Sequence, residues 1–429
     1  MRFDLMHPAD QLVTVMERIY GYKMTTTSGG NLSVLDDNGD IWITPAGVDK
    51  GSLTREDIVR VSQSGEITGQ HRPSSEWPFH SILYKRRPDI KAVLHAHPPA
   101  LLSFSIVRKI PDTMLIPNAD IICGEVKMAD YDVPGSAELG LAIAKVFDTG
   151  VRTVMLENHG VVVGHTDIFS AFMAFETLDF CARLEINARM LDKPKPLNEE
   201  KIEISRKKNN ACLEEFTADK YSSEERGARS QMSALISRSY HQELFTSTQG
   251  TFSMRLSDGA FIITPYGVDR KYMRPEDIVR IENEKKEQGK NPSRSVLLHK
   301  YIYEKNPDIN SVIIAHPPNI MAFSVCDAKF DSRIIPESYI MLRDVKKLPF
   351  GSSFMQPKMT ADEISLSSPV VLVENDCVIV AGTSLINAFD RLEVAEYSAK
   401  AIIAAKQLGN IVKISDDEIE KINKVFNLK

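Results

Sequence analysis

The sequence predicts two tandem α/β domains, in each of which helices cover a mixed or antiparallel β-sheet. Two observations lead to this prediction. The chain has 429 residues, more than one ordinary compact core accommodates, and four blocks of sequence recur in the same order. Within one copy, hairpin and helix patterns do not alternate strictly, which argues against a doubly wound parallel sheet.

The repeat is carried by four matched blocks. ITPAGVDKGSLTREDIVRV, from Ile43, matches ITPYGVDRKYMRPEDIVRI, from Ile263, at an offset of 220 residues. RPDIKAVLHAHPP, from Arg87, matches NPDINSVIIAHPP, from Asn306, at 219, and LENHGVVVGHT matches VENDCVIVAGT at 217. Upstream, TTTSGGNLSV, from Thr25, pairs with TSTQGTFSMR, from Thr246, within one residue of the first register. Offsets that drift by only three residues indicate a tandem duplication of one domain of about 200 residues.

The domain boundaries follow from the repeat. We place the first domain at residues 1–200, a linker at 201–222 and the second domain at 223–429. The stretch between the copies, from Lys193 to about Tyr221, begins rich in Pro, Lys and Glu and stays polar throughout. This composition predicts a partly helical linker.

The first elements of a copy follow from periodicity and turn residues. Asp10–Tyr20 carries apolar residues near a spacing of 3.6 and predicts a helix. Asn31–Leu35 and Asp40–Thr44 flank an Asp-Asp-Asn-Gly turn and predict a hairpin. Glu76–Arg87 predicts a helix, which Pro88 closes.

The second half of a copy predicts three further strands and a long helix. Lys91–His97 reads as an apolar strand that Pro98-Pro99 stops. Thr153–Leu156 and Val161–Gly164 predict strands on either side of an Asn-His-Gly turn. Asp167–Leu191 predicts the long helix.

The composition is that of an ordinary globular protein, with 43% hydrophobic and 26% charged residues. The net charge of −6 argues against a nucleic-acid or anionic-membrane surface but leaves room for a local basic pocket. No signal pattern opens the sequence, and no apolar run approaches the ~18 residues of a membrane span. The five cysteines are scattered without a CxxC pair, so neither a disulfide framework nor a thiolate zinc site is expected, and a reduced, cytoplasmic setting fits best.

Two histidines form a candidate half of a metal site. The strand period of two puts His95 and His97 on one face of their predicted strand. His159, in the tight Asn-His-Gly turn, is the candidate third ligand, and three imidazoles leave a fourth position open for substrate, as in catalytic zinc sites. The alternative is that the HxH pair is a surface or hydrogen-bonded pair of histidines at a strand end.

Two further segments could bind an anion beside these histidines. Glu76 follows RPSS (residues 72–75), so hydroxyl and backbone N–H groups gather at a helix N-terminus, which favours anions. The glycines of SGGN (residues 28–31) would let backbone N–H groups approach a phosphate closely. Both segments, and TPAG (residues 44–47), also fit plain turns or a helix cap.

In chain order, SGGNLS, ITPAG, RPSSEWPFH, AVLHAHPP and ENHG resemble the class II aldolase/adducin family, and in motif terms its L-fuculose-1-phosphate aldolase type. The resemblance covers nearly all of residues 1–200 and, more weakly, 224–405. It implies an α/β fold with a central, mostly antiparallel sheet flanked by helices. It also implies zinc, or another divalent metal such as manganese, held by His95, His97 and His159. The family's catalytic carboxylate and its phosphate pocket map onto Glu76 and onto Gly30, Asn31, Gly47, Ser74 and Ser75.

The activity implied by the resemblance is that of a metal-dependent lyase, an aldolase of carbohydrate metabolism that cleaves a small phosphorylated ketose. The metal would stabilise an enediolate as a Lewis acid, and Glu76 would shuttle the proton on the enediolate carbon. Epimerase, dehydratase and decarboxylase relatives pass through the same intermediate and are the alternatives. Epimerases typically carry Asp where this chain has Glu76. An alternative of another class is a non-catalytic, adducin-like scaffold or sensor.

Two departures from the fuculose-phosphate aldolase pattern leave the sugar and the second acid/base residue open. Those aldolases use a tyrosine from a neighbouring subunit, and the matching stretch here, residues 115–118, contains none. Ala46 stands where they place a phosphate-binding hydroxyl. The sequence therefore specifies the metal site more closely than the substrate.

The second copy keeps the turns of the first but not its chemistry. At the repeat register it carries Ile314 for His95, Asp376 for His159, Ser295 for Glu76, Arg294 for Ser75 and Thr251 for Asn31. His316 matches His97, and because one His and one Asp make a poor zinc site, we expect no metal there. The family usually forms fourfold tetramers, so a homodimer of this two-copy chain would mimic one, with the second copy supporting the first.

Overall fold

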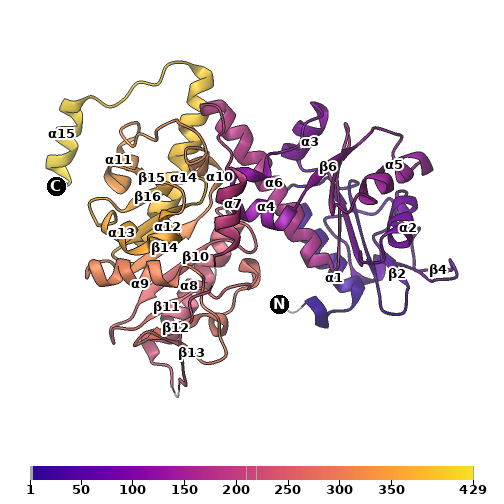
Figure 1. Ribbon diagram of the computed structural model, residues 1–429, viewed down its shortest axis with the longest axis horizontal. Helices are drawn as coiled ribbons and strands as arrows, with labels where there is room; N and C mark the ends of the chain where they lie inside the picture. The colour runs from indigo at the N-terminus through magenta and orange to yellow at the C-terminus, as the bar shows by residue number, and fades with distance from the viewer. Residues whose placement is uncertain (1–2, 209, 219, 429) are drawn as a thin grey trace. The chain divides into compact units, whose positions relative to one another are not determined.

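The computed structural model describes residues 3–208, 210–218 and 220–428. Each copy of the repeat builds a mixed β-sheet with helices packed against it (Figure 1). Among the described residues, none of the helices combines the length and the hydropathy that a bilayer crossing requires.

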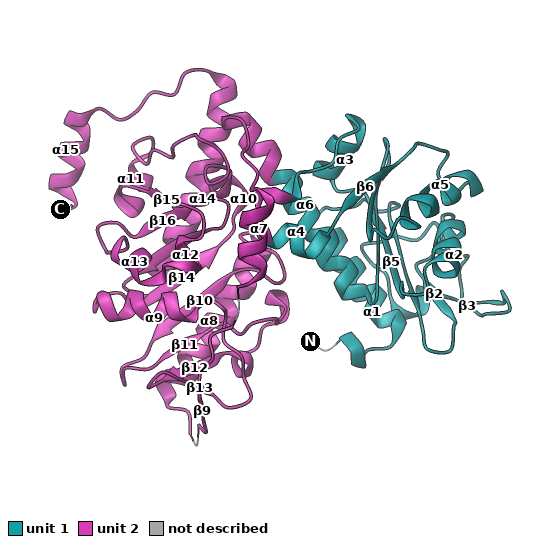
Figure 2. Cartoon of the chain, in the orientation of Figure 1, with its two compact units in different colours: residues 1–113, 118–183 teal, residues 114–117, 184–429 magenta. Residues whose placement is uncertain are grey.

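Two compact units divide the chain (Figure 2). The first unit comprises Met1–Thr113 and Asn118–Arg183, and the second comprises Met114–Pro117 and Leu184–Lys429. The division falls within the long helix α6 (Ile168–Leu191). The short segment Met114–Pro117 belongs to the second unit because it hydrogen-bonds there, for example from the side chain of Asn375 to the carbonyl of Leu115 at 2.8 Å.

The first sheet has the strand order β4-β3-β2-β1-β5-β8-β7-β6. Its strands are β1 (Asn31–Leu35), β2 (Ile41–Ile43), β3 (Val59–Val61), β4 (Ile67–Thr68), β5 (Ala92–Ala96), β6 (Val126–Ala129), β7 (Thr153–Leu156) and β8 (Gly160–His165). Neighbouring strands pair antiparallel, except β6 and β7, which are parallel. A parallel pair needs a crossover, and α5 (Ala137–Phe147) supplies it. The sheet is therefore mixed rather than purely antiparallel.

The helices of this unit are α1 (Pro8–Gly21), α2 (Trp77–Arg86), α3 (Pro99–Ile106), α4 (Pro117–Cys123), α5 and the first part of α6. Helices α2 and α5 share one apolar core with the sheet, built among others from Phe79, Leu83, Ile143, Phe147 and Val154. This core fixes the start of α2 against β1 and β5, where the candidate site lies.

The predicted elements recur with small shifts at their ends. Strands β1 and β7 have the predicted bounds, Asn31–Leu35 and Thr153–Leu156. The helix predicted from Glu76 begins at Trp77, because Glu76 itself is the N-cap residue of α2. The strand predicted through His97 ends at Ala96, so His97 lies just beyond β5.

The second sheet has the order β15-β16-β17-β14-β10-β11-β12-β13-β9. Its strands are β9 (Glu215–Phe216), β10 (Thr251–Arg255), β11 (Phe261–Ile263), β12 (Val279–Glu282), β13 (Lys285–Glu287), β14 (Ser311–Ala315), β15 (Lys346–Leu348), β16 (Val370–Val373) and β17 (Cys377–Gly382). The parallel pair β15–β16 repeats β6–β7, and β9, from the predicted linker, adds a second parallel pair with β13.

The helices of the second unit are α7 (Glu199–Arg206), α8 (Ser223–His241), α9 (Val296–Lys305), α10 (Pro318–Ala322), α11 (Pro336–Leu342), α12 (Ser352–Met355), α13 (Pro357–Asp362), α14 (Leu385–Leu408) and α15 (Asp416–Val425). Short 3-10 turns lie at Phe3–Leu5, Arg55–Asp57, Thr113–Leu115, Arg270–Tyr272 and Pro275–Asp277.

Equivalent residues of the two copies occupy equivalent positions in the two sheets. Asn31 faces His95 across β1 and β5, and Thr251 faces Ile314 across β10 and β14.

Candidate metal centre

Three histidines converge in the first copy. His95 is fully buried on β5, His97 follows that strand, and His159 lies in the turn between β7 and β8. One ring nitrogen of each lies within 4.8 Å of the other two. Among the described residues, no other set of three His, Cys, Asp or Glu side chains converges in this way. The three residues that the sequence proposed as ligands are thus brought to one place.

Glycines permit this close approach. A Cβ atom on Gly160 would lie 2.7 Å from the ring of His97 and 2.7 Å from the carbonyl oxygen of Ala96. A Cβ atom on Gly29 would lie 2.9 Å from Nδ1 of His97. Real Cβ atoms essentially never come so close to other heavy atoms, so both positions need glycine for His97 to sit where it does. In the second copy these positions hold Cys377 and Gln249.

The orientation of His95 makes it a ready ligand. Its Nδ1 lies 3.0 Å from the carbonyl oxygen of Val161, so Nδ1 carries hydrogen and donates it. That bond turns Nε2 toward the other two histidines, and Nε2 of His97 lies only 2.9 Å away. A hydrogen bond from the remote ring nitrogen to a carbonyl is the usual support of a metal-binding histidine.

Glu76 lies beside the histidines at the start of α2. Its Oε2 is 3.2 Å from Nε2 of His95, and its Oε1 is 3.6 Å from Nε2 of His159. The side-chain amide of Asn31 donates a 2.6 Å hydrogen bond to Oε2. Oε1 is buried and has no hydrogen-bond partner among the described residues. One carboxylate oxygen is therefore fixed by hydrogen bonding, whereas the other makes no hydrogen bond to the described residues and is free in this sense.

The pKa values of these groups indicate where the proton resides in the metal-free protein. Burial raises the pKa of Glu76, but His95, Asn31 and His159 together lower it by more, and the result lies below the usual range. Burial lowers the pKa of His95, yet the Glu76 carboxylate outweighs it, and the result is raised. Burial and the neighbouring imidazoles lower the pKa of His97 to about 3 and that of His159 to about 4. Without metal, His95 is therefore the histidine of the three with the highest pKa, and it pairs with the Glu76 carboxylate.

A chain of buried hydrogen bonds continues from Asn31 away from the histidines. Oδ1 of Asn31 accepts from Nε2 of His80 at 2.5 Å, and Nδ1 of His80 accepts from the hydroxyl of Ser33 at 2.7 Å. The hydroxyl of Tyr84 donates to Ser33 at 2.7 Å. Burial lowers the pKa of His80 to about 3, so the chain is neutral. It fixes the amide of Asn31 in the orientation that faces Glu76.

The sequence analysis did not predict this chain of hydrogen bonds, although the spacing of its residues indicates it. Glu76, His80 and Tyr84 are spaced by four residues, which places them along one face of a helix. The second copy repeats His299 and Tyr303 at the same register.

The second copy has the same serine, histidine and tyrosine hydrogen bonds, but it has no carboxylate beside them among the described residues. Ser253 lies 2.7 Å from His299 and 2.6 Å from the hydroxyl of Tyr303. Thr251, at the position of Asn31, bonds to Ser293 at 2.8 Å instead. Nε2 of His299 has no partner in the described part of the chain. The Ser-His-Tyr group thus belongs to the scaffold of both copies, and only Asn31 couples it to an acid.

The five residues proposed for the phosphate differ in burial and in contacts. Ser74 is buried, and its hydroxyl accepts from the backbone N–H of Glu76 at 3.2 Å, whereas Ser75 is exposed. Gly30 and Gly47 both have positive φ, at 73° and 70°. Open space surrounds Gly47, whereas a Cβ atom on Gly30 would lie 2.9 Å from the carbonyl oxygen of His95. The amide of the fifth residue, Asn31, is engaged with Glu76.

A family comparison places this chain among known proteins. The sequence profile of the Class II Aldolase and Adducin N-terminal domain matches residues 10–186 and again residues 230–403. The chain belongs to the class II aldolase and adducin family. Each of its two copies is matched by that family, which confirms the tandem arrangement proposed from the sequence.

Relatives within the family include enzymes of two kinds. The chain is 31% identical over 208 residues to the 5-deoxy-D-ribulose 1-phosphate aldolase of Bacillus thuringiensis serovar kurstaki, covering 46% of this chain and 93% of that protein. It is 32% identical over 174 residues to an L-fuculose phosphate aldolase of Methanococcus maripaludis, covering 41% and 93%. It is 34% identical over 163 residues to the 3-oxo-tetronate 4-phosphate decarboxylase of Pectobacterium atrosepticum, covering 37% and 74%. Each alignment thus covers less than half of this chain but most of the relative's length.

Proposed function

We propose that the first copy is a metal-dependent aldolase that cleaves a small phosphorylated ketose. The observation that carries the proposal is the convergence of three imidazoles on a carboxylate whose Oε1 is buried and free. Two of the relatives described above are sugar-phosphate aldolases, which supports the same reaction.

The three histidines fit a divalent metal. Nε2 of His95 faces the cluster because Nδ1 is occupied, and His97 and His159 are neutral above about pH 4. Three nitrogen donors suit zinc better than manganese, which prefers oxygen, and they leave a coordination position open. When bound, the metal supplies a Lewis acid that stabilises negative charge on the oxygens of the ketose as the carbon–carbon bond breaks.

The chain's own residues position the proton. Asn31 holds Oε2 of Glu76, so the free Oε1 is the atom that takes or gives the proton at the substrate carbon next to the ketone. Glu76 is only 7% exposed, so bulk water does not compete for that proton. The substrate phosphate would bind at the start of α2, where backbone N–H groups favour anions, with Ser74, Ser75, Gly30 and Gly47 as its pocket.

Decarboxylation is the second candidate, because one relative is a decarboxylase. Loss of carbon dioxide from the hydroxyl-bearing carbon next to a ketone leaves the same kind of enediolate as aldol cleavage, and Glu76 would protonate it in the same way. The two reactions differ only in the bond that breaks, so product analysis separates them.

The test is a screen of phosphorylated ketoses with the zinc-loaded protein, with released aldehyde as the readout. We expect aldehyde release that falls by a factor of about 10² to 10⁴ in Glu76→Gln, which keeps the shape of the side chain but not its base. Release of carbon dioxide from a phosphorylated 3-oxo acid, without aldehyde from any ketose, would contradict the aldolase proposal and support the decarboxylase. An unchanged rate in Glu76→Gln would remove the carboxylate from the mechanism.

A further inference from the structure

A cavity of about 290 Å³ lies in the second copy at the start of α9. Arg294 and Ser295 line it, at the positions that Ser75 and Glu76 hold in the first copy. Lys207 and Lys208, which directly follow α7 and have no counterpart in the first copy, line it as well. The cavity thus lies where the first copy has its acid and part of its phosphate pocket, but its polar groups are different.

Cations dominate this cavity. Lys207, Lys208 and Arg294 line it, and no Asp or Glu does so among the described residues. Arg294 donates from Nη1 to the carbonyl oxygen of Lys208 at 3.5 Å, and its guanidinium lies 5.1 Å from the ring centre of Tyr266. The ammonium of Lys208 lies 4.6 Å from the ring centre of Phe354. These contacts orient two of the cations without neutralising them.

One acid that contacts a residue of this cavity offsets only part of its charge. Asp376, at the position of His159, accepts a hydrogen bond from the hydroxyl of Ser353, which lines the cavity. His316 adds no charge, because burial lowers its pKa to about 4. Lys208 lies close enough to His316 to lower that pKa further. A fixed cation therefore stands near the place that corresponds to the three-histidine cluster.

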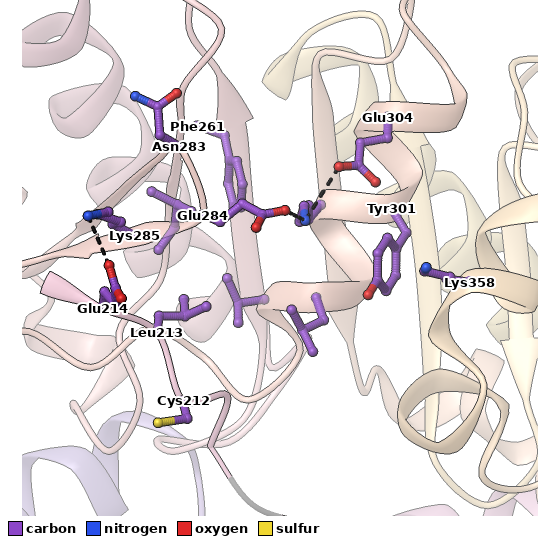
Figure 3. A pocket seen from close by; sticks show the side chains of 14 residues that line it. Cys212, Leu213, Glu214, Phe261, Asn283, Glu284, Lys285, Tyr301, Glu304 and Lys358 are labelled. Atoms are coloured by element: carbon purple, nitrogen blue, oxygen red, sulfur yellow. Dashed lines mark hydrogen bonds and ion pairs between the residues drawn. The ribbon is translucent and has the colours of Figure 1, made fainter.

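A larger cavity of about 870 Å³ in the same copy shows the opposite arrangement (Figure 3). Three lysines and three glutamates line it: Lys285 pairs with Glu214 at 2.9 Å, and Lys300 pairs with both Glu284 and Glu304. The ammonium of the third lysine, Lys358, lies 5.1 Å from the ring centre of Tyr301. The cations of the larger cavity are thus balanced, whereas those of the smaller cavity are not.

We propose that the second copy binds a small organic phosphate in the 290 Å³ cavity, without a metal. The phosphate group would be held by Arg294, Lys207 and Lys208, and the N-terminus of the ten-residue helix α9 adds to the attraction. Most of the other lining residues are apolar, among them Ile204, Leu298 and Phe354, so the ligand carries an organic part as well. The site is separate from the three-histidine cluster and does not depend on the reaction proposed for it.

The test is calorimetric titration of the full-length chain with glycerol 1-phosphate and, separately, with inorganic phosphate. Arg294→Ser, which restores the residue of the first copy, and Lys208→Ala should each weaken one binding component for glycerol 1-phosphate by about tenfold or more. Lys358→Ala, in the larger cavity, and Glu76→Gln, in the first copy, should leave that component unchanged. Arg294→Lys should retain part of the affinity and thereby exclude a folding defect.

Three outcomes would overturn the proposal. Binding that is equal in wild type, Arg294→Ser and Lys208→Ala would remove the site. A component that disappears when the chain is stripped of metal would assign the phosphate to the metal centre instead. Equal affinity for inorganic phosphate and glycerol 1-phosphate would contradict the use of the apolar wall. A failed aldolase assay leaves all three comparisons intact, so the two proposals fail separately.

Discussion

The side-chain amide of Asn31 donates a 2.6 Å hydrogen bond to Oε2 of Glu76, and both residues are buried. The same amide group accepts from His80 through its oxygen, so its orientation is fixed from behind. Asn31 was expected from the sequence to serve the phosphate. In the structure its amide holds one oxygen of Glu76, whereas the other oxygen makes no hydrogen bond within the described part of the chain, and the role of Asn31 toward the phosphate stays a prediction.

Replacing Asn31 by threonine, the residue of the second copy, tests this relationship. Thr is too short to reproduce the bond to Glu76, and a hydrogen bond to a charged group contributes about 1.5–3 kcal/mol. We expect kcat for ketose cleavage to fall by a factor of about 10 to 100, with the metal content unchanged. Steady-state kinetics and metal analysis of the same sample measure both. A kcat within twofold of wild type would show that the bond does not position the acid.

The pH dependence of metal affinity reports the proton on His95. The pKa of His95 is raised above 6.5, whereas those of His97 and His159 are lowered to about 3 and about 4. Between pH 5 and 6.5, metal therefore displaces one proton, and affinity falls as the pH falls. We expect the logarithm of the zinc association constant, from chelator competition, to rise by about one unit per pH unit. A slope near three would mean that all three histidines are protonated in this window, and a flat line would mean that none is.

The buried Ser-His-Tyr group offers a matched pair of variants. His80 and His299 occupy equivalent positions with equivalent bonds to Ser33 and Ser253. Because each variant removes the acceptor to which a buried serine hydroxyl donates, His80→Ala and His299→Ala should each destabilise their own copy by about 1–3 kcal/mol in denaturant unfolding. Only His80→Ala should also lower kcat, since only His80 holds an Asn that faces an acid. Equal loss of activity in both variants would contradict this assignment.

Sequence patterns predicted the helices and strands whose formation depends on residues that are close together in the sequence. Periodicity and turn residues located α1, the β1–β2 hairpin, β5 and β7, and the repeat doubled each of them. The parallel strand β6 was not predicted, because its pairing with β7 depends on a crossover and not on its own short sequence. Strand β9 was read as linker for the same reason, since its two residues gain a strand only by pairing with β13.

The candidate site was predictable to the extent that its residues stand in recognisable motifs. His95, His97, His159 and Glu76 were named from spacing and family resemblance, and the structure brings them together. The role of Gly29 was not predictable, because it depends on how closely His97, which is distant in sequence, approaches it. The cavity lined by Lys207 and Lys208 was not predictable either, because it forms only when the segment after α7 packs beside α9.

The central claim is that one copy of the two holds a metal, and metal analysis of three full-length proteins tests it most directly. Wild type should hold about one zinc per chain after loading and desalting. His97→Ala should hold almost none, whereas His316→Ala, the equivalent change in the second copy, should still hold about one. Two metals per chain in wild type, or a metal content that His97→Ala leaves unchanged, would contradict the account.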